Sequence, residues 1–323
     1  MRMLKSICAA SLLSLAAISV ASCSSNSNED EIPADGLTRI RVTMNPLNTR
    51  LGYIDQADGL ITSWTKNDAF RIIPDNGNES QVFTLAEGAG TPVGTFVGTA
   101  PEVGDGTYTV LFPSTLQSVE EFDTFSFAGQ RQDGSSNVKG IAAYHTVKLV
   151  GTTSDYTAFS FANAVQPSVM VLSFKKLPDY VGSPTQITLK ADENCLATTN
   201  STVSNEISLK LVNMTASPTL TAYLVLGANP GNAKLSAGKQ LKINVTGTTG
   251  KCYKTFVVES DVVFDGGKRH VINVSNWDLD DTPIDKDIII TVPSFGDGVI
   301  LDDSSASTGG NTPSFGGGVN IED

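Results

Sequence analysis

The stretch QLKINVTGTTGKCYKTFVV, residues 240–258, carries the local pattern that decides the fold. Apolar side chains occupy alternate positions at Leu241, Ile243 and Val245, with polar residues between them. This period of two places the apolar residues on one face of a half-buried strand. A turn rich in glycine and threonine follows, and a second run of strand-forming residues returns from it. The stretch therefore predicts a β-hairpin with one face on a hydrophobic core.

Similar short runs occur on both sides of this hairpin, separated by clusters of glycine, proline, asparagine and aspartate. Strand-forming residues dominate these runs, and long helix-forming runs are scarce. Short strands with turns at intervals of roughly 8–12 residues are typical of β-sandwiches. The chain has 323 residues, which is enough for two ordinary domains. We therefore predict an all-β fold with an N-terminal sandwich over residues 37–150, a C-terminal sandwich over 151–281 and an extended tail over 282–323.

The first predicted strand, TRIRVTM, alternates clearly. Ile40, Val42 and Met44 share one face, whereas Arg39 and Arg41 point to the other. The strand is therefore expected to bury its aliphatic face and to present its arginines to solvent.

The N-terminus has the layout of an export signal. Two basic residues precede an uncharged apolar run of about 16 residues, which is shorter than the roughly 20 residues of a membrane span. The small residues before Cys23 resemble the lipobox of bacterial lipoproteins. This pattern predicts a signal peptide over residues 1–22 and lipidation of Cys23; the alternative is an ordinary signal peptide that contains a cysteine.

Residues 23–36 read as an acidic tether, with Glu29, Asp30 and Glu31 shortly after the predicted anchor. This block resembles the export signal of surface lipoproteins in bacteria of the Bacteroides type. It predicts a lipid-anchored protein exposed at the cell outer membrane. The alternative is a solvated linker without a targeting role, because acidic polar segments are usually disordered.

The charge balance argues against some partners. The chain has 34 acidic and 22 basic residues, for a formal net charge of −12, and no basic cluster reverses this. An acidic protein is a poor candidate for binding nucleic acid or an anionic lipid surface. We therefore expect no nucleic-acid partner.

The sequence contains no recognisable catalytic or cofactor motif. Its two histidines, His145 and His270, are far apart, and we expect His270 to be a partly exposed strand residue. No nucleophile elbow, phosphate-binding loop or dinucleotide fingerprint is present. The acidic stretch at 278–287 lacks the glycine and the late glutamate of an EF-hand loop, and reads better as a solvated linker. We expect no enzyme activity, no cofactor and no metal.

Two pairs of residues leave alternatives open. Cys195 and Cys252 could form a disulfide outside the cytoplasm, or could remain unpaired thiols on different strands. Trp64 and Trp277 could stack on sugars, but a tryptophan at a strand end of a sandwich is more often part of the core.

The tail contains one strongly apolar candidate strand and a local duplication. The candidate strand includes Ile288, Ile289, Ile290 and Val292. Because it is too apolar to remain in water, it should fold back as the last strand of its own unit or fill a groove on a neighbouring molecule. In the second case, the duplicated segments PSFGDGVILDD and PSFGGGVNIED, which are joined by a flexible linker, would hang beyond that strand as a flexible end.

The order and spacing of several segments resemble the fimbrillin-like family of Bacteroides-type surface lipoproteins. The resemblance covers residues 37–277 and depends on order and spacing, with no strict signature. The segments that carry it are SWTKNDAFRI, FVGTAPEVGDGTYTVLFPS, FAGQRQDGSSNVKGIAAYHT, FSFANAVQPSVMVLSFK and the stretch from YLVLGANPG to KCYKTF. The stretch VEEFDTFSFAGQRQDGSSNVKGIAAYHTVKLVG, residues 119–151, is expected to form a strand, an exposed loop and a second strand.

The resemblance implies two transthyretin-like β-sandwiches and a role in type V fimbriae. Family subunits travel as lipidated precursors, and a trypsin-like protease cuts after an arginine in the first strand. The loss of this strand leaves a groove, and a strand from the next subunit fills it. The candidate cleavage sites in this chain are Arg39, Arg41 and Arg50. The duplicated C-terminal segment departs from the family pattern.

The sequence therefore predicts a structural subunit, tip or anchor component of a fimbrium that assembles by strand addition with other fimbrial subunits. The alternative is a stand-alone surface lipoprotein that binds a glycan or host ligand without polymerising. Both readings place the chain at the outer membrane through its lipid anchor.

Overall fold

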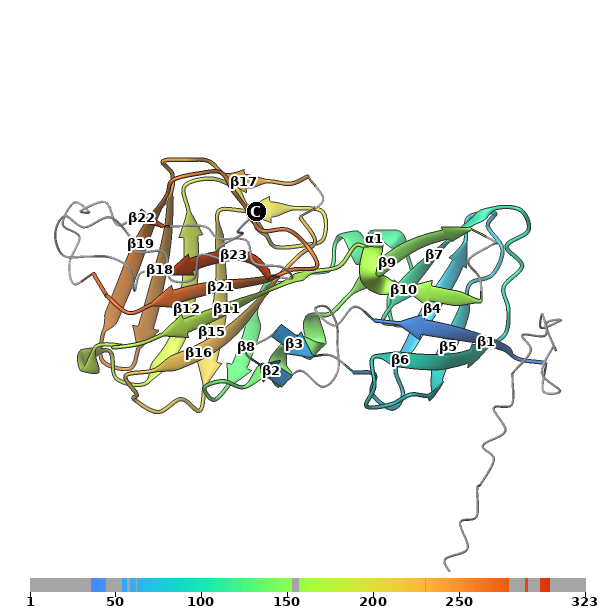
Figure 1. Ribbon diagram of the computed structural model, residues 1–323, viewed down its shortest axis with the longest axis horizontal. Helices are drawn as coiled ribbons and strands as arrows, with labels where there is room; N and C mark the ends of the chain where they lie inside the picture. The colour runs from blue at the N-terminus through green and yellow to red at the C-terminus, as the bar shows by residue number, and fades with distance from the viewer. Residues whose placement is uncertain are drawn as a thin grey trace, which may run out of the picture.

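The computed structural model describes residues 36–44, 54–56, 59–61, 63–152, 157–229, 231–278, 288–289 and 297–302. Strands account for nearly all of the regular structure, which confirms the all-β prediction. The strands form two units that lie side by side along the long axis (Figure 1). In the described part of the chain, no helix is long and apolar enough to cross a membrane.

The N-terminal unit is built on a single sheet of seven strands in the order β10-β1-β6-β5-β4-β7-β9. All neighbours are antiparallel except β1 and β10. Lys148 of β9 forms an antiparallel bridge to Val165, which follows β10, so the two margins of the sheet meet around one core. The strands are β1 (Thr38–Thr43), β4 (Ala69–Pro74), β5 (Gln81–Glu87), β6 (Val93–Gly98), β7 (Thr107–Phe112), β9 (Val147–Thr152) and β10 (Ala158–Ser160).

Aromatic side chains fill the core of this unit. Trp64 is fully buried, and its ring centroid lies 4.7 Å from that of Phe96, 5.6 Å from that of Phe112 and 6.1 Å from that of Phe161. These edge-on contacts are the favoured geometry for aromatic pairs. Trp64 is therefore a core residue, as the sequence predicted.

The C-terminal unit has two sheets around one core. The first sheet has the order β16-β11-β21-β23, and the second has the order β22-β19-β18-β12-β15-β8. Their bounds are β8 (Gln130–Asp133), β11 (Ser168–Phe174), β12 (Pro184–Ala191), β15 (Glu206–Val212), β16 (Leu220–Leu226), β18 (Gln240–Gly247), β19 (Lys251–Val258), β21 (Arg269–Val274), β22 (Ile288–Ile289) and β23 (Asp297–Asp302).

The β-hairpin predicted over residues 240–258 is confirmed as β18 and β19. Leu241 pairs with Phe256 and Val245 with Cys252, and the pairing is antiparallel along the whole hairpin. Leu241, Ile243 and Val245 are fully buried, as their period of two predicted.

Short elements complete the fold. They are the pairs β2 (Ile54–Gln56) with β3 (Gly59–Ile61), β13 (Leu196–Ala197) with β14 (Val203–Ser204) and β17 (Lys234–Leu235) with β20 (Val262–Val263), helix α1 (Val119–Asp123), and the 3-10 turns η1 (Val138–Tyr144), η3 (Phe161–Asn163) and η4 (Asp179–Val181).

The chain crosses between the two units more often than a single boundary at residue 150 implies. β8 lies before that boundary but pairs with β15 of the C-terminal unit. β10 lies after the boundary but pairs with β1 of the N-terminal unit. The two units are therefore interleaved in sequence between residues 130 and 160.

Two local predictions from the sequence are wrong. Over residues 119–151, the closing strand is confirmed as β9, but α1, β8 and η1 occupy the places of the predicted first strand and exposed loop. Ser118 begins α1 by accepting a hydrogen bond from the Glu121 backbone N–H at 3.1 Å, and the Glu121 side chain reaches back to the Gln117 N–H at 2.7 Å. This exchange is close to a capping box, which stabilises a helix start.

The second correction concerns His270, which was expected to be partly exposed. It does lie in a strand, β21, but it is fully buried. Its Nε2 lies 3.0 Å from the Asp265 carbonyl oxygen, and its ring packs edge-on against Phe264 at 5.4 Å. Burial is possible because the backbone carbonyl provides a polar partner.

Candidate functional site

The candidate functional site is β1 together with the two strands that hold it. All six residues of β1 pair with β6, from Thr38 opposite Gly98 to Thr43 opposite Val93. On the other side, residues 41–43 pair in parallel with β10. β1 therefore occupies a slot between a long neighbour and a short one.

The inner face of β1 contributes directly to the core. Ile40 and Val42 are fully buried and Met44 is 2 % exposed, whereas Arg39 and Arg41 are exposed. This outcome confirms the alternation predicted for the strand. Each buried aliphatic side chain of this size contributes about 1.5–3 kcal/mol of hydrophobic free energy.

The slot that β1 occupies has an aromatic floor, which consists of Phe70, Phe96 and Phe159. Phe96 of β6 and Phe159 of β10 pair with Ile40 and Val42, and both rings contact Phe70, at 4.9 Å and 5.8 Å between centroids. Without β1, the chain would present an apolar trough bordered by the unpaired backbone of β6. Such an edge binds an incoming extended strand readily, because the strand supplies both hydrogen bonds and apolar side chains.

The candidate cleavage residues differ in their setting. Arg39 and Arg41 lie inside β1; Arg41 pairs on both sides, with Thr95 and Ala158, and its N–H donates to the Thr157 carbonyl oxygen at 3.2 Å. A protease acting there would first have to separate the strand from its neighbours. Arg50 follows β1 in the sequence and lies outside the described residues.

The tail residues pair within their own chain. Ile288 and Ile289 form β22, which runs parallel to β19 opposite Val257 and Val258. Ile290 and Val292 lie outside the described residues. The arrangement matches the fold-back alternative for this strand.

The first copy of the duplicated segment also forms a strand. Residues 297–302 make β23, which pairs in parallel with β21. The groove-filling alternative, in which both copies hang beyond the donated strand, therefore does not describe the first copy. The second copy lies outside the described residues.

Cys195 and Cys252 are buried free thiols, so the candidate disulfide is not formed in this structure. Cys252 pairs opposite Val245, whereas Cys195 follows Ala191, which pairs opposite Leu241. Burial raises the pKa of both thiols to about 12, so they are poor nucleophiles at neutral pH.

The remaining candidate residues have structural roles where the structure describes them. Trp277 is half-buried, packs on Phe174 at 5.2 Å and donates its indole N–H to the Lys175 carbonyl oxygen at 3.0 Å. From the acidic stretch at 278–287, only Asp278 is described; it accepts from the Thr255 N–H at 3.0 Å. Cys23, the predicted signal peptide and the predicted tether up to residue 35 lie outside the described residues.

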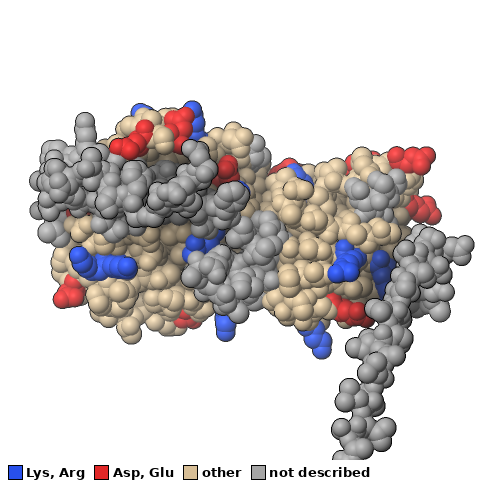
Figure 2. Space-filling view, in the orientation of Figure 1, with Lys and Arg blue, Asp and Glu red and all other residues tan. Residues whose placement is uncertain are grey.

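Within the ranges that the structure describes, no group of three or more His, Cys, Asp or Glu is placed to hold a metal ion. His145 and His270 are buried in different units. On the face shown in Figure 2, acidic and basic side chains are interspersed, without a large patch of either sign.

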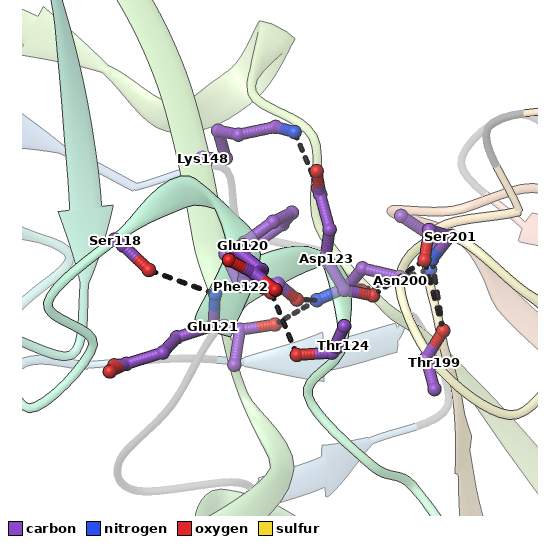
Figure 3. Close-up of polar contacts among 12 residues, drawn as sticks. Ser118, Glu120, Glu121, Phe122, Asp123, Thr124, Lys148, Thr199, Asn200 and Ser201 are labelled. Carbon is purple, nitrogen blue, oxygen red and sulfur yellow. Dashed lines mark hydrogen bonds and ion pairs between the residues drawn. The ribbon is translucent and has the colours of Figure 1, made fainter.

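A polar junction connects the two units (Figure 3). Asn200, 2 % exposed, donates to the Phe122 carbonyl oxygen and to Thr146 Oγ1, both at 2.9 Å. Ser201 Oγ donates to the Asp123 carbonyl oxygen at 2.8 Å, and the Asp123 carboxylate pairs with Lys148 at 2.7 Å. The loop between β13 and β14 thus holds α1 of the N-terminal unit.

Comparison with known proteins gives no match: no protein-family model and no curated protein is similar to this chain at a significant level.

Proposed function

We propose that this chain is a lipid-anchored surface protein that serves as a structural subunit, tip or anchor component of a type V fimbrium. In this proposal Cys23 holds the precursor in the outer membrane, and the partners are other fimbrial subunits. The finer description of the fold, two tandem transthyretin-like sandwiches, belongs to the same proposal.

The observation that carries the proposal is the position of β1. It is a single short strand near the start of the described chain, paired over its full length with β6, and it covers an aromatic floor with Ile40 and Val42. Removing one edge-proximal strand leaves the rest of the sheet continuous from β6 to β9. A strand of a neighbouring subunit could then restore both the hydrogen bonds and the apolar contacts.

The proposal favours Arg50 among the three candidate cleavage sites. A cut after Arg39 leaves Ile40 and Val42 attached to the sheet, and a cut after Arg41 divides the strand. Only a cut after β1 releases the whole strand and empties the slot. Arg50 is the candidate that follows β1 in the sequence.

A stand-alone surface lipoprotein that binds a glycan or host ligand is the second candidate function. It is favoured by the pairing of β22 and β23 with strands of their own chain. A donor strand for a neighbour would have to leave that position first.

The N-terminus of protein sheared from cells distinguishes the two functions by mass analysis. A processed subunit begins at Leu51, whereas a stand-alone lipoprotein retains a lipidated Cys23. Arg50→Ala should abolish processing and polymer formation while leaving export intact. The double variant Arg39→Ala with Arg41→Ala is the matched control and should polymerise normally. Undiminished polymer from a variant lacking all three arginines would contradict the processing model.

A further inference from the structure

β16 lies at a margin of the C-terminal unit and has an uncharged sequence. β16 forms the margin of the four-stranded sheet and pairs only with β11 among the strands of that sheet. Its sequence, LTAYLVL, has no charge and no proline. Strands of this composition at a sheet margin readily pair with identical strands of other molecules.

Two glutamine side chains of β8 occupy this edge. Gln130 and Gln132 are each 2 % exposed and alternate with the exposed residues Arg131 and Asp133. β8 belongs to the opposite sheet, at the margin that faces β16 (Figure 1). The two glutamines therefore point inward and reach across from one sheet to the other.

Gln130 pairs with Val225 in the manner of a peptide group. Its Oε1 accepts a hydrogen bond from the Val225 N–H at 2.8 Å, and its Nε2 donates to the Val225 carbonyl oxygen at 2.6 Å. The Nε2 also donates to the Phe127 carbonyl oxygen at 2.8 Å. Both backbone groups that Val225 turns away from β11 are thus occupied.

Gln132 continues the same ladder two residues further along. Its Oε1 accepts from the Tyr223 N–H at 2.8 Å, and its Nε2 donates to the Thr221 carbonyl oxygen at 2.9 Å. At the end of the ladder, Ser135 Oγ accepts from the Thr221 N–H at 3.2 Å. The outward N–H groups of three alternate β16 residues therefore all have side-chain acceptors.

We propose that Gln130 and Gln132 are edge-closing residues that prevent β16 from pairing with β16 of a second copy of the chain. A carboxamide carries one acceptor and one donor group, so it satisfies a strand edge as a neighbouring peptide would. Unlike a strand, it offers no further backbone edge on its other side. This inference goes beyond the proposed function and does not depend on it, because it concerns the isolated folded chain.

Hydrogen exchange of the wild-type protein gives the first test and needs no variant. The Tyr223 and Val225 amides should exchange as slowly as those of Ala222 and Leu224, which lie in the same strand. Exchange of Tyr223 and Val225 at least about tenfold faster than their neighbours would overturn the proposal, because it would mean that the glutamines do not hold the edge.

The second test replaces both side chains in the double variant Gln130→Leu with Gln132→Leu. The Tyr223 and Val225 amides lose their acceptors, and the inward-facing positions 130 and 132 become apolar. We expect a folded protein whose Tyr223 and Val225 amides exchange at least about tenfold faster in dilute solution. At higher concentration it should form dimers or larger species by light scattering, with these amides protected again.

The matched control is Gln186→Leu, the same substitution on β12 of the same unit. The Gln186 side chain is exposed and bonds only to the Thr188 and Ser208 hydroxyls. This variant should remain monomeric with unchanged exchange. A folded double variant that stays monomeric at high concentration, or a control that associates equally, would refute the edge-closing role. If the double variant fails to fold, the wild-type exchange pattern still decides the question.

Discussion

Asn200 is the residue on which the junction between the two units depends most. Its buried side chain donates to the Phe122 carbonyl oxygen and to Thr146 Oγ1, and accepts from the Ala228 N–H at 3.2 Å. Asn200→Ala removes all three bonds and leaves buried polar groups without partners. We expect the free energy of unfolding to fall by about 1–3 kcal/mol in urea titration.

Ser201→Ala provides the control for this prediction. Ser201 is exposed, donates to the Asp123 carbonyl oxygen at 2.8 Å and has a weaker contact of 3.4 Å with Thr199 Oγ1. Because water can replace that bond, the expected loss is about 0.5–1 kcal/mol. Equal losses for the two variants would show that the buried amide has no special role in the junction.

At the scale of residues, the sequence predicted the aliphatic positions and missed the polar ones. Ile40 and Val42 follow from a local period of two, which any reader of the sequence can detect. Gln130 and Asn200 occupy buried positions because they bond to backbone groups 95 and 78 residues away in the chain. A local sequence pattern cannot indicate partners so far away in the chain. Polar residues between glycines, such as Gln130, instead resemble a loop.

At the scale of elements, β6 pairs with β1 on one side and packs against the aromatic core. Gly94 pairs with Val42, and a Cβ atom at Gly94 would lie 2.6 Å from Leu85 Cδ1 and 2.8 Å from Trp64 Cδ1. Gly94→Ala therefore forces the fully buried Trp64 to move. We expect a loss of about 1–3 kcal/mol in unfolding free energy, with a shift in tryptophan fluorescence.

Gly231→Ala is a suitable control, since a Cβ at Gly231 meets nothing within 4 Å. Its stability and fluorescence should match the wild type. A Gly94 variant as stable as the Gly231 variant would mean that the floor beneath β1 is loosely packed.

The elements themselves were predictable where their pattern was local and missed where it was not. The hairpin of β18 and β19 and the strand β1 could be identified from alternation alone. Helix α1 carries a start signal in Ser118 and Glu121, but its five residues are too few to show a helical period. β8 is stabilised by pairing with β15, far along the chain, and its alternating glutamines do not resemble a core-facing strand.

At the scale of the whole molecule, the number of units was easier to predict than the set of strands that belongs to each unit. Composition and strand spacing indicated two β units, but β8 and β10 each join the unit on the far side of the expected boundary. Exchange of strands between units depends on long-range pairing, which the order of the strands alone does not specify. Together with the Asn200 junction, this exchange links the two units through both backbone and side-chain bonds.

The tail provides the last prediction at this scale. β22 and β23 cover the outer edges of β19 and β21, one in each sheet of the C-terminal unit. Truncation after Asp281 removes both strands and exposes two unpaired edges on the same molecule. We therefore expect a lower unfolding midpoint in urea and aggregation at concentrations where the full chain is monomeric, measured by light scattering. Truncation after Asp303 is the matched control, because it removes the second copy of the duplicated segment but keeps β22 and β23, and it should leave both properties unchanged. If the shorter chain were as stable and as monomeric as the control, the two strands would contribute nothing to their own unit, and a role for them on a neighbouring molecule would become the better account.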